Sequence, residues 1–245
     1  MPQTRFCSKC GASLATGADH CALCRTPVAA FAAEVGGGSA SPAGNPWLSM
    51  WLHPRVTIRT ILNHDATHLV LPIAAVGGIS QALNRLAQKN AADSLSFPVI
   101  LLVACVVGPL GGIVSLYFMA AVLRVAGRWI GGQASAEQIR ASIAWGAVPA
   151  LWGAMLWVPA IGLTGGALFS SERPGTLSAG VLLAGSLMIV QLVTAVWGFF
   201  TGLHSLGETQ GFSAWKAFGN VMLAAAIVLG PLALLVAVAV AVVPR

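Results

Sequence analysis

The sequence predicts an all-α integral membrane protein with a small separate domain at its N-terminus. Of its 245 residues, 57% are hydrophobic and only 8% are charged, whereas average soluble domains carry about 25% charged residues. Five uncharged runs follow residue 65, and each can form one membrane-spanning helix, which needs about 20 residues. We therefore expect residues 66–245 to form a five-helix membrane domain.

The first 28 residues contain two Cys-x-x-Cys turns that are separated by ten residues. Each turn can aim two thiolates at one ion, and four thiolates close a tetrahedral zinc site that has no open position. We therefore expect residues 1–28 to form a zinc ribbon that holds one structural zinc ion. The predicted ligands are Cys7, Cys10, Cys21 and Cys24.

The charge of this zinc-ribbon head argues against nucleic acid as its partner. Arg5, Lys9 and Arg25 contribute three positive charges and Asp19 one negative charge, while zinc with four thiolates contributes about two negative charges. A head that is close to neutral lacks the basic surface of a nucleic-acid-binding domain. We expect a structural or protein-binding role instead. Residues 29–44, which are rich in Gly, Ala and Ser, are typical of a flexible linker.

Residues 45–65 are predicted to form two short amphipathic helices, which begin at Pro46 and Pro54 because proline is favoured in the first turn of a helix. Indole rings and cationic side chains beside apolar residues suit the lipid headgroup layer. Two locations stay open, the membrane interface or the surface of the membrane domain. The expected membrane-interface residues, two of which precede the last span, are Trp47, Trp51, Arg55, Arg59, Trp215 and Lys216.

The five expected spans cover about residues 66–86, 96–123, 141–163, 177–203 and 217–243. Lysine and arginine are enriched on the cytosolic side of membrane proteins. An N-terminus in the cytosol would place nine of the 13 basic residues on the inner side. The first 25 residues also contain no apolar core of a secretory signal. We therefore expect a cytosolic N-terminus and, after five spans, an external C-terminus.

Polar residues inside the spans limit the candidate functions. We expect no carboxylate, lysine or arginine at mid-membrane, which argues against ion-coupled carriers and membrane hydrolases. Gln191 is the most central polar side chain and is expected to make either an interhelical hydrogen bond or a ligand contact. Cys105 is expected to be a buried apolar residue. Gly108-Pro109 and Gly230-Pro231 lie in oppositely directed spans, a pattern that also occurs in transporters.

Three motifs together resemble the Yip domain family of Ypt/Rab-interacting, five-span membrane proteins. They are residues 51–62 (WLHPRVTIRTIL), 142–149 (SIAWGAVP) and 211–217 (GFSAWKA), and the resemblance covers residues 47 to about 243. The first 25 residues separately resemble a bacterial zinc-ribbon module, which suggests a family member of the bacterial type. The resemblance implies a five-span helical body and assigns no catalytic residue.

We therefore expect a non-enzymatic protein of the bacterial cytoplasmic (inner) membrane. It would be a membrane anchor or an assembly or trafficking platform with a cytosolic zinc-ribbon contact module. Its expected partners are the lipid bilayer and proteins that bind the ribbon or associate through the helices. The alternative function is a small-solute permease or channel.

Overall fold

The computed structural model describes residues 5–6, 13–14, 45–171 and 179–242, without the side chains of residues 5–6, 13–14, 179–181, 232, 234 and 236–242. The chain separates into two compact units, Met1–Asn45 and Pro46–Arg245. In the first unit, β1 (Arg5–Phe6) pairs with β2 (Ser13–Leu14) in antiparallel register. The four predicted zinc ligands and the predicted linker, residues 29–44, lie outside the described residues.

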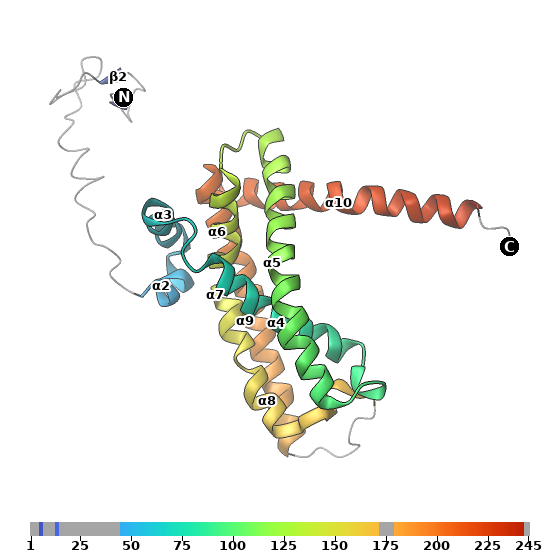
Figure 1. Cartoon of the computed structure of the whole chain (residues 1–245). Coiled ribbons are helices and arrows are strands. Elements are labelled where there is room, and N and C mark those ends of the chain that lie inside the picture. The colour runs from blue at the N-terminus through green and yellow to red at the C-terminus, as the bar shows by residue number, and fades with distance from the viewer. Residues whose placement is uncertain (1–4, 7–12, 15–44, 172–178, 243–245) are drawn as a thin grey trace. The chain divides into compact units, whose positions relative to one another are not determined.

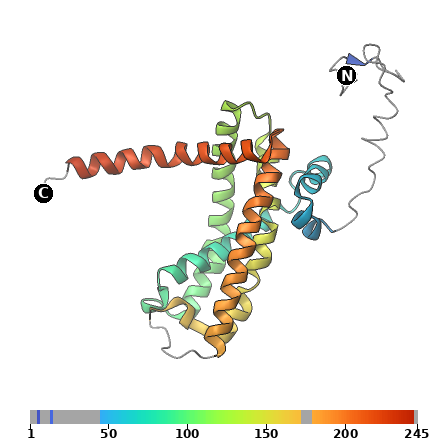
Figure 2. The same ribbon diagram turned by 180° about the vertical axis from the view of Figure 1, so that it is seen from behind.

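The second unit is helical throughout its described residues (Figure 1). Of its two longest helices, α5 packs mainly against α4, and α9 packs mainly against α6 and α7. Figure 2 shows the same arrangement from behind. The α-helices are α2 (Pro46–Leu52), α3 (Pro54–His64), α4 (Val70–Gln88), α5 (Phe97–Trp129), α6 (Ala136–Gly146), α7 (Val148–Ala154), α8 (Trp157–Thr164), α9 (Ala179–Gln210) and α10 (Ala214–Val242). Two short 3-10 helices, η1 (Ala91–Asp93) and η2 (Gly165–Phe169), complete the unit.

Four stretches of the described residues are long and apolar enough to cross a membrane, where the sequence predicts five. They are Phe97–Trp129, Val148–Phe169, Leu182–Gln210 and Ala214–Pro231. The expected first span, residues 66–86, forms the 19-residue helix α4, which is not among the four. The second half of α4 contains polar residues such as Gln81, Asn84 and Arg85, which lower its mean hydropathy.

The expected third span, residues 141–163, is interrupted twice. Residues 136–146 form α6, which begins with a capping box: Gln138 N donates to Ser135 Oγ, and Ser135 N donates to Gln138 Oε1. The apolar stretch begins only at Val148, in α7, which has a proline in its first turn, and it continues through α8 and η2. The sequence therefore placed this span seven residues too early, because periodicity cannot show a helix break inside an apolar run.

Helices α4 and α5 meet backbone to backbone through glycines. A Cβ atom placed on Gly112 would lie 2.8 Å from Gly78 Cα, and one placed on Gly108 would lie 2.8 Å from Ile79 Cα. Gly108 and Gly112 have the spacing of the GxxxG pattern that lets membrane helices approach closely. Cys105 is exposed. The expected burial of Cys105 is therefore wrong, because the buried row of α5 at this level passes through Ala104 and Gly108 beside it.

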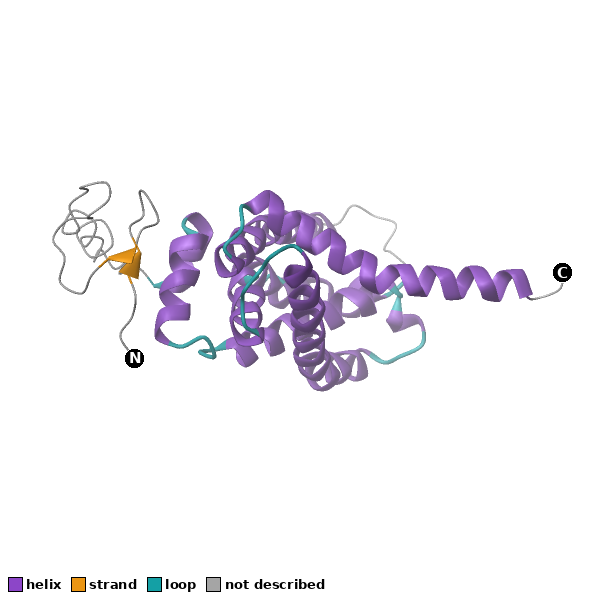
Figure 3. Ribbon diagram, turned by 90° about the horizontal axis from the view of Figure 1, so that it is seen from above, coloured by secondary structure: helices purple, strands orange, loops and turns teal. Residues whose placement is uncertain are grey.

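Helix α10 runs crosswise to α5 and α9, and its second half extends beyond the other helices (Figures 1 and 3). Ser213 caps its start by accepting a hydrogen bond from Lys216 N at 3.2 Å. Ala217 and Ala224 are buried, whereas Leu229 and Leu235 are more than half exposed. The first half of α10 therefore contacts protein, and Leu229 and Leu235 offer an apolar surface.

Replacing Gly112 by alanine should destabilise the protein by about 1–3 kcal/mol, because the new Cβ overlaps the backbone of α4. Gly111 is the matched control, since a Cβ there meets no described atom within 4 Å. Gly111→Ala should be neutral or slightly stabilising because alanine favours helix more than glycine does. Thermal unfolding in mild detergent would measure both variants. Equal melting temperatures for the two would contradict the close approach of α4 and α5.

Candidate functional site

The three sequence motifs meet at one end of the second unit, in a region that we call the motif junction. It consists of α2 and α3, the break between α6 and α7, and the turn from α9 to α10. Fully buried residues from three of these helices, Met50, Ile58 and Trp145, belong to one apolar core. Segments that are far apart in the sequence therefore form a single packed site.

Trp145 is the centre of this core. Its indole is fully buried, and the ring of Trp47 packs against it with centroids 5.4 Å apart. Trp145 Nε1 donates a hydrogen bond to His68 O at 3.1 Å, which satisfies the single polar atom of the side chain. This hydrogen bond ties α6 to the segment that joins α3 and α4.

The apolar side of α3 packs on protein. Of the two locations that the sequence left open for this helix, that side occupies the surface of the membrane domain. Thr57, Ile58 and Ile61 are buried, whereas Val56 and Thr60 are exposed. Only the exposed side of α3 can therefore contact lipid headgroups, together with Leu52 at the end of α2, which is also exposed.

Helix α9 is joined to α2 and α6 by hydrogen bonds to main-chain carbonyls. Trp197 Nε1 donates to Trp51 O at 3.0 Å, and Thr201 Oγ1 donates to Gly146 O at 2.7 Å. A Cβ placed on Gly146 would lie 2.7 Å from Gly202 Cα. The backbones of α6 and α9 therefore approach closely where the Thr201 hydroxyl reaches the end of α6.

The charged part of the motif junction is a cluster that we call the Glu208 clamp. Glu208 Oε1 lies 2.6 Å from Arg59 Nη2, and Glu208 Oε2 lies 3.5 Å from Arg55 Nη1. Arg55 Nη2 also donates to Phe212 O at 3.3 Å. The Glu208 side chain is only 17% exposed, so its charge is partly desolvated and depends on these two arginines. The clamp joins α3 to the end of α9.

The sequence pointed to different partners for these charges. Arg55 and Arg59 were expected at lipid headgroups, and Glu208 is 149 residues beyond Arg59. The sequence does show that Arg55 and Arg59 lie on one side of a helix, because they are four residues apart. It does not show that this side faces the end of α9.

The turn from α9 to α10 explains the third motif. Gly211 has φ +72°, a left-handed conformation that commonly ends helices and that glycine adopts without strain. Phe212 is buried, its carbonyl accepts from Arg55, and its ring lies 4.4 Å from Lys216 Nζ. Trp215 is 84% exposed. The indole of Trp215 is therefore free to contact lipid headgroups, the location that the sequence predicts for it.

Gln191 lies on α9 opposite α7. Its Nε2 donates a hydrogen bond to Gly153 O at 3.3 Å, and Thr194 on the next turn packs closely against Gly153. This interhelical contact is one of the two roles that the sequence left open for Gln191. Among the described residues, no group of three or more His, Cys, Asp and Glu side chains could hold a metal ion.

The fold and these contacts define a multi-span helical membrane protein, with several apolar helices that contact the lipid bilayer. The sequence profile of the Yip1 domain matches residues 48–236, so the chain belongs to the Yip1 domain family. Comparisons with curated proteins and with solved structures gave no significant match.

Glu208→Gln should loosen α3, because the amide keeps the shape of the side chain and removes the charge that both arginines contact. A loss of about 1–2 kcal/mol corresponds to about 5- to 30-fold faster amide exchange in α3, measured by hydrogen–deuterium exchange mass spectrometry. Glu137→Gln is the control, since Glu137 is 63% exposed and lies 3.9 Å from Arg140, and exposed pairs contribute little. Equal exchange of α3 in the two variants would refute the clamp.

Proposed function

We propose that this Yip1-domain protein is a non-enzymatic membrane anchor or assembly and trafficking platform, and that its N-terminal zinc ribbon is a contact module for protein partners. The observation that carries the proposal is the motif junction. Its buried indole, its carbonyl-directed hydrogen bonds and the Glu208 clamp all hold the first two helices of the membrane domain. Those contacts fix where the N-terminal segment leaves the membrane domain. A fixed departure point is what a platform with a tethered head requires.

The β1–β2 pairing supports the zinc ribbon. Phe6 and Ser13 are partners in the β1–β2 pair, and the first Cys-x-x-Cys motif, Cys7 to Cys10, lies between them in the sequence. A hairpin turn is a usual place for two zinc ligands because it brings their side chains to one point. We infer that Cys21 and Cys24 supply the other two ligands and that binding of zinc provides most of the folding free energy of the head.

We place the protein in a bacterial cytoplasmic membrane because its first 25 residues resemble a bacterial zinc-ribbon module, and we place its N-terminus in the cytosol on the distribution of basic residues. We infer that α4 also spans the membrane, which brings the number of spans from four to five. Its 19 residues are about 28 Å long, close to the thickness of the hydrocarbon core, and its glycine contact with α5 keeps it beside a spanning helix. Five spans place the C-terminus outside.

The alternative function, a small-solute permease or channel, depended on Gln191 and on the Gly-Pro pairs. Gln191 contacts a carbonyl of α7, and Gly108 provides close packing between α4 and α5. Gln191 and Gly108 therefore have structural roles, whereas a Cβ at Gly230 meets no described atom within 4 Å. We propose the platform in preference to the permease.

Metal analysis tests the zinc ribbon directly. Reduced full-length protein should contain one zinc ion per chain, and Cys10→Ser should lower this content severalfold because three thiolates bind zinc less tightly than four. Cys105→Ser is the matched control, since Cys105 lies on α5, in the other unit, and this variant should keep its zinc. A reduced wild-type protein with far less than one zinc per chain would contradict the ribbon.

Co-purification tests the contact role of the head. Full-length protein and a variant without residues 1–28 would be isolated from native membranes in mild detergent, and their bound proteins compared. We expect the deletion to lose a subset of partners that Cys10→Ser also loses, because both remove the folded head. An identical set of partners for all three proteins would exclude the head as the contact module. Partners that all three proteins retain would bind the membrane domain, as the platform requires.

A further inference from the structure

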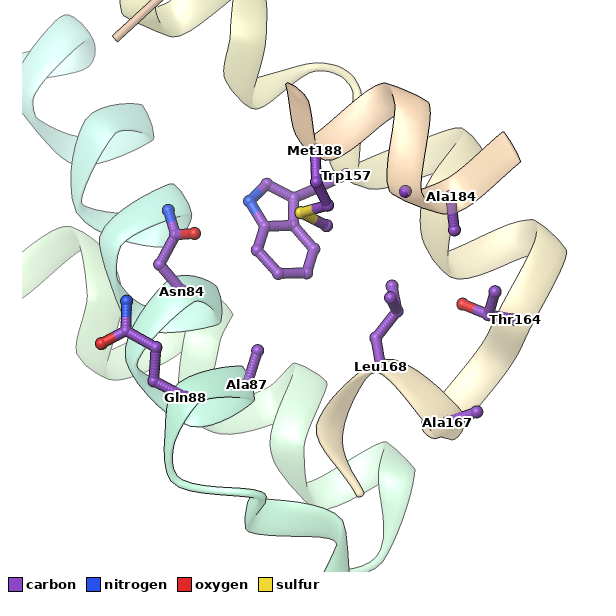
Figure 4. A pocket seen from close by; sticks show the side chains of 10 residues that line it. Asn84, Ala87, Gln88, Trp157, Thr164, Ala167, Leu168, Ala184 and Met188 are labelled. Atoms are coloured by element: carbon purple, nitrogen blue, oxygen red, sulfur yellow. The ribbon is translucent and has the colours of Figure 1, made fainter. Parts of the chain in front are cut away.

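A cavity of about 430 Å³ lies between α4, α8, η2 and α9, and its lining residues are distinct from those of the motif junction. Figure 4 shows the side chains that line it. Leu168, Met188 and the alanines form apolar walls, while Asn84, Gln88 and Thr164 bring polar groups. A mainly apolar cavity of this size with a few polar groups is typical of a ligand site.

Trp157 supplies an unsatisfied hydrogen-bond donor in this cavity. Its side chain is only 3% exposed, and its ring stacks on Phe169 with centroids 5.8 Å apart. Nε1 is buried and has no hydrogen-bond partner among the described residues. Figure 4 shows the nitrogen edge of the indole turned toward Asn84. Buried indole N–H groups normally find a partner, so this atom indicates an acceptor that the described residues do not provide.

The wall formed by η2 is held in place by Asp93 of η1. Asp93 Oδ1 accepts hydrogen bonds from Ser170 Oγ at 2.9 Å and from Ser171 N at 3.0 Å. Hydrogen bonds from Ser171 and then from Ser170 hold the pKa of Asp93 below its usual range, so the carboxylate stays ionised at neutral pH. The η2 wall of the cavity is therefore fixed to η1 by the hydrogen bonds to Asp93.

The surroundings of the cavity are apolar and continuous with the surface that contacts the bilayer. Val158 on α8 is 75% exposed and Leu182 on α9 is 57% exposed, and both helices belong to candidate spans. Asn84, Gln88 and Thr164 supply too few polar groups to fill a cavity of this size with water, because each water molecule normally needs two to four polar partners. A molecule that enters from lipid and carries one hydrogen-bond acceptor fits both the walls and the free donor.

We propose that this cavity binds a membrane phospholipid, with one acyl chain along Leu168 and Met188 and its ester carbonyl oxygen accepting a hydrogen bond from Trp157 Nε1. The site adds a specific lipid contact to the platform, and it is independent of the zinc-ribbon head.

Photo-crosslinking tests the site in the full-length protein. The protein would be reconstituted into vesicles of phosphatidylethanolamine and phosphatidylglycerol that contain a trace of phospholipid with a diazirine in its acyl chain. Matched probes would carry that chain through an ester or an ether bond. We expect the wild type to be labelled in peptides from α8 and α9, with about threefold to tenfold more labelling by the ester probe, the ratio that one net hydrogen bond provides.

Two variants separate a specific site from general lipid contact. Gly185→Leu places a side chain at the cavity lining, and Gly162→Leu places the same side chain on α8 outside the lining; a Cβ at either position meets no described atom within 4 Å. We expect Gly185→Leu to reduce labelling severalfold and Gly162→Leu to leave it unchanged. Equal labelling of these variants would show only general contact with the bilayer and would overturn the proposal.

Trp157→Phe tests the hydrogen bond, because phenylalanine keeps an aromatic ring and removes the donor. It should abolish the preference for the ester probe while retaining labelling by the ether probe. A wild type that labels equally with both probes, or a variant that keeps the ester preference, would overturn the role of Trp157. Circular dichroism and melting temperature would confirm that each variant is folded before labelling is compared.

Discussion

Hydrogen bonds from side chains to main-chain carbonyls at helix ends and breaks hold the second unit together. Trp197 reaches the end of α2, Trp145 the segment before α4, Thr201 the end of α6, Gln191 the end of α7 and Arg55 the second residue after α9. Carbonyls at helix ends lack the usual partner four residues later in the same helix, although Gly153 O also accepts from Leu156 N. In or near lipid, where water is scarce, such groups must be satisfied by the protein.

This constraint explains why α9 is long and continuous while its neighbours are broken. Three of the five donors, Gln191, Trp197 and Thr201, lie on α9, spaced along one helix that provides a rigid row of donors. The stretch from α6 to α8 can break at Ala147 and before Trp157 because α9 covers the carbonyls that its breaks expose. The glycine contacts, Gly146 with Gly202 and Gly153 with Thr194, bring the backbones near enough for short side chains to reach.

The sequence could predict features that depend on local chemistry. The helix starts at Pro46 and Pro54 follow from residues within a few positions of each other, and the structure confirms both. Four of the long apolar runs likewise correspond to candidate spans. The Glu208 clamp, the acceptors of Trp145 and Trp197 and the free donor of Trp157 depend on pairs that are far apart in the chain. Hydrophobic periodicity carries no information about those pairs. It also does not give the angle between helices, since α10 is as apolar as its neighbours and yet runs crosswise to α5 and α9.

The long sequence separation within the Glu208 clamp also sets an order of events during synthesis. Glu208 follows Arg59 by 149 residues, so at about 5–20 residues per second it emerges roughly 7–30 s later. During that interval both arginines lack Glu208, and anionic headgroups at the membrane surface can serve as their counter-charge. The nascent chain can thus be retained at the membrane surface by the same two guanidinium groups that later fasten α3 to α9.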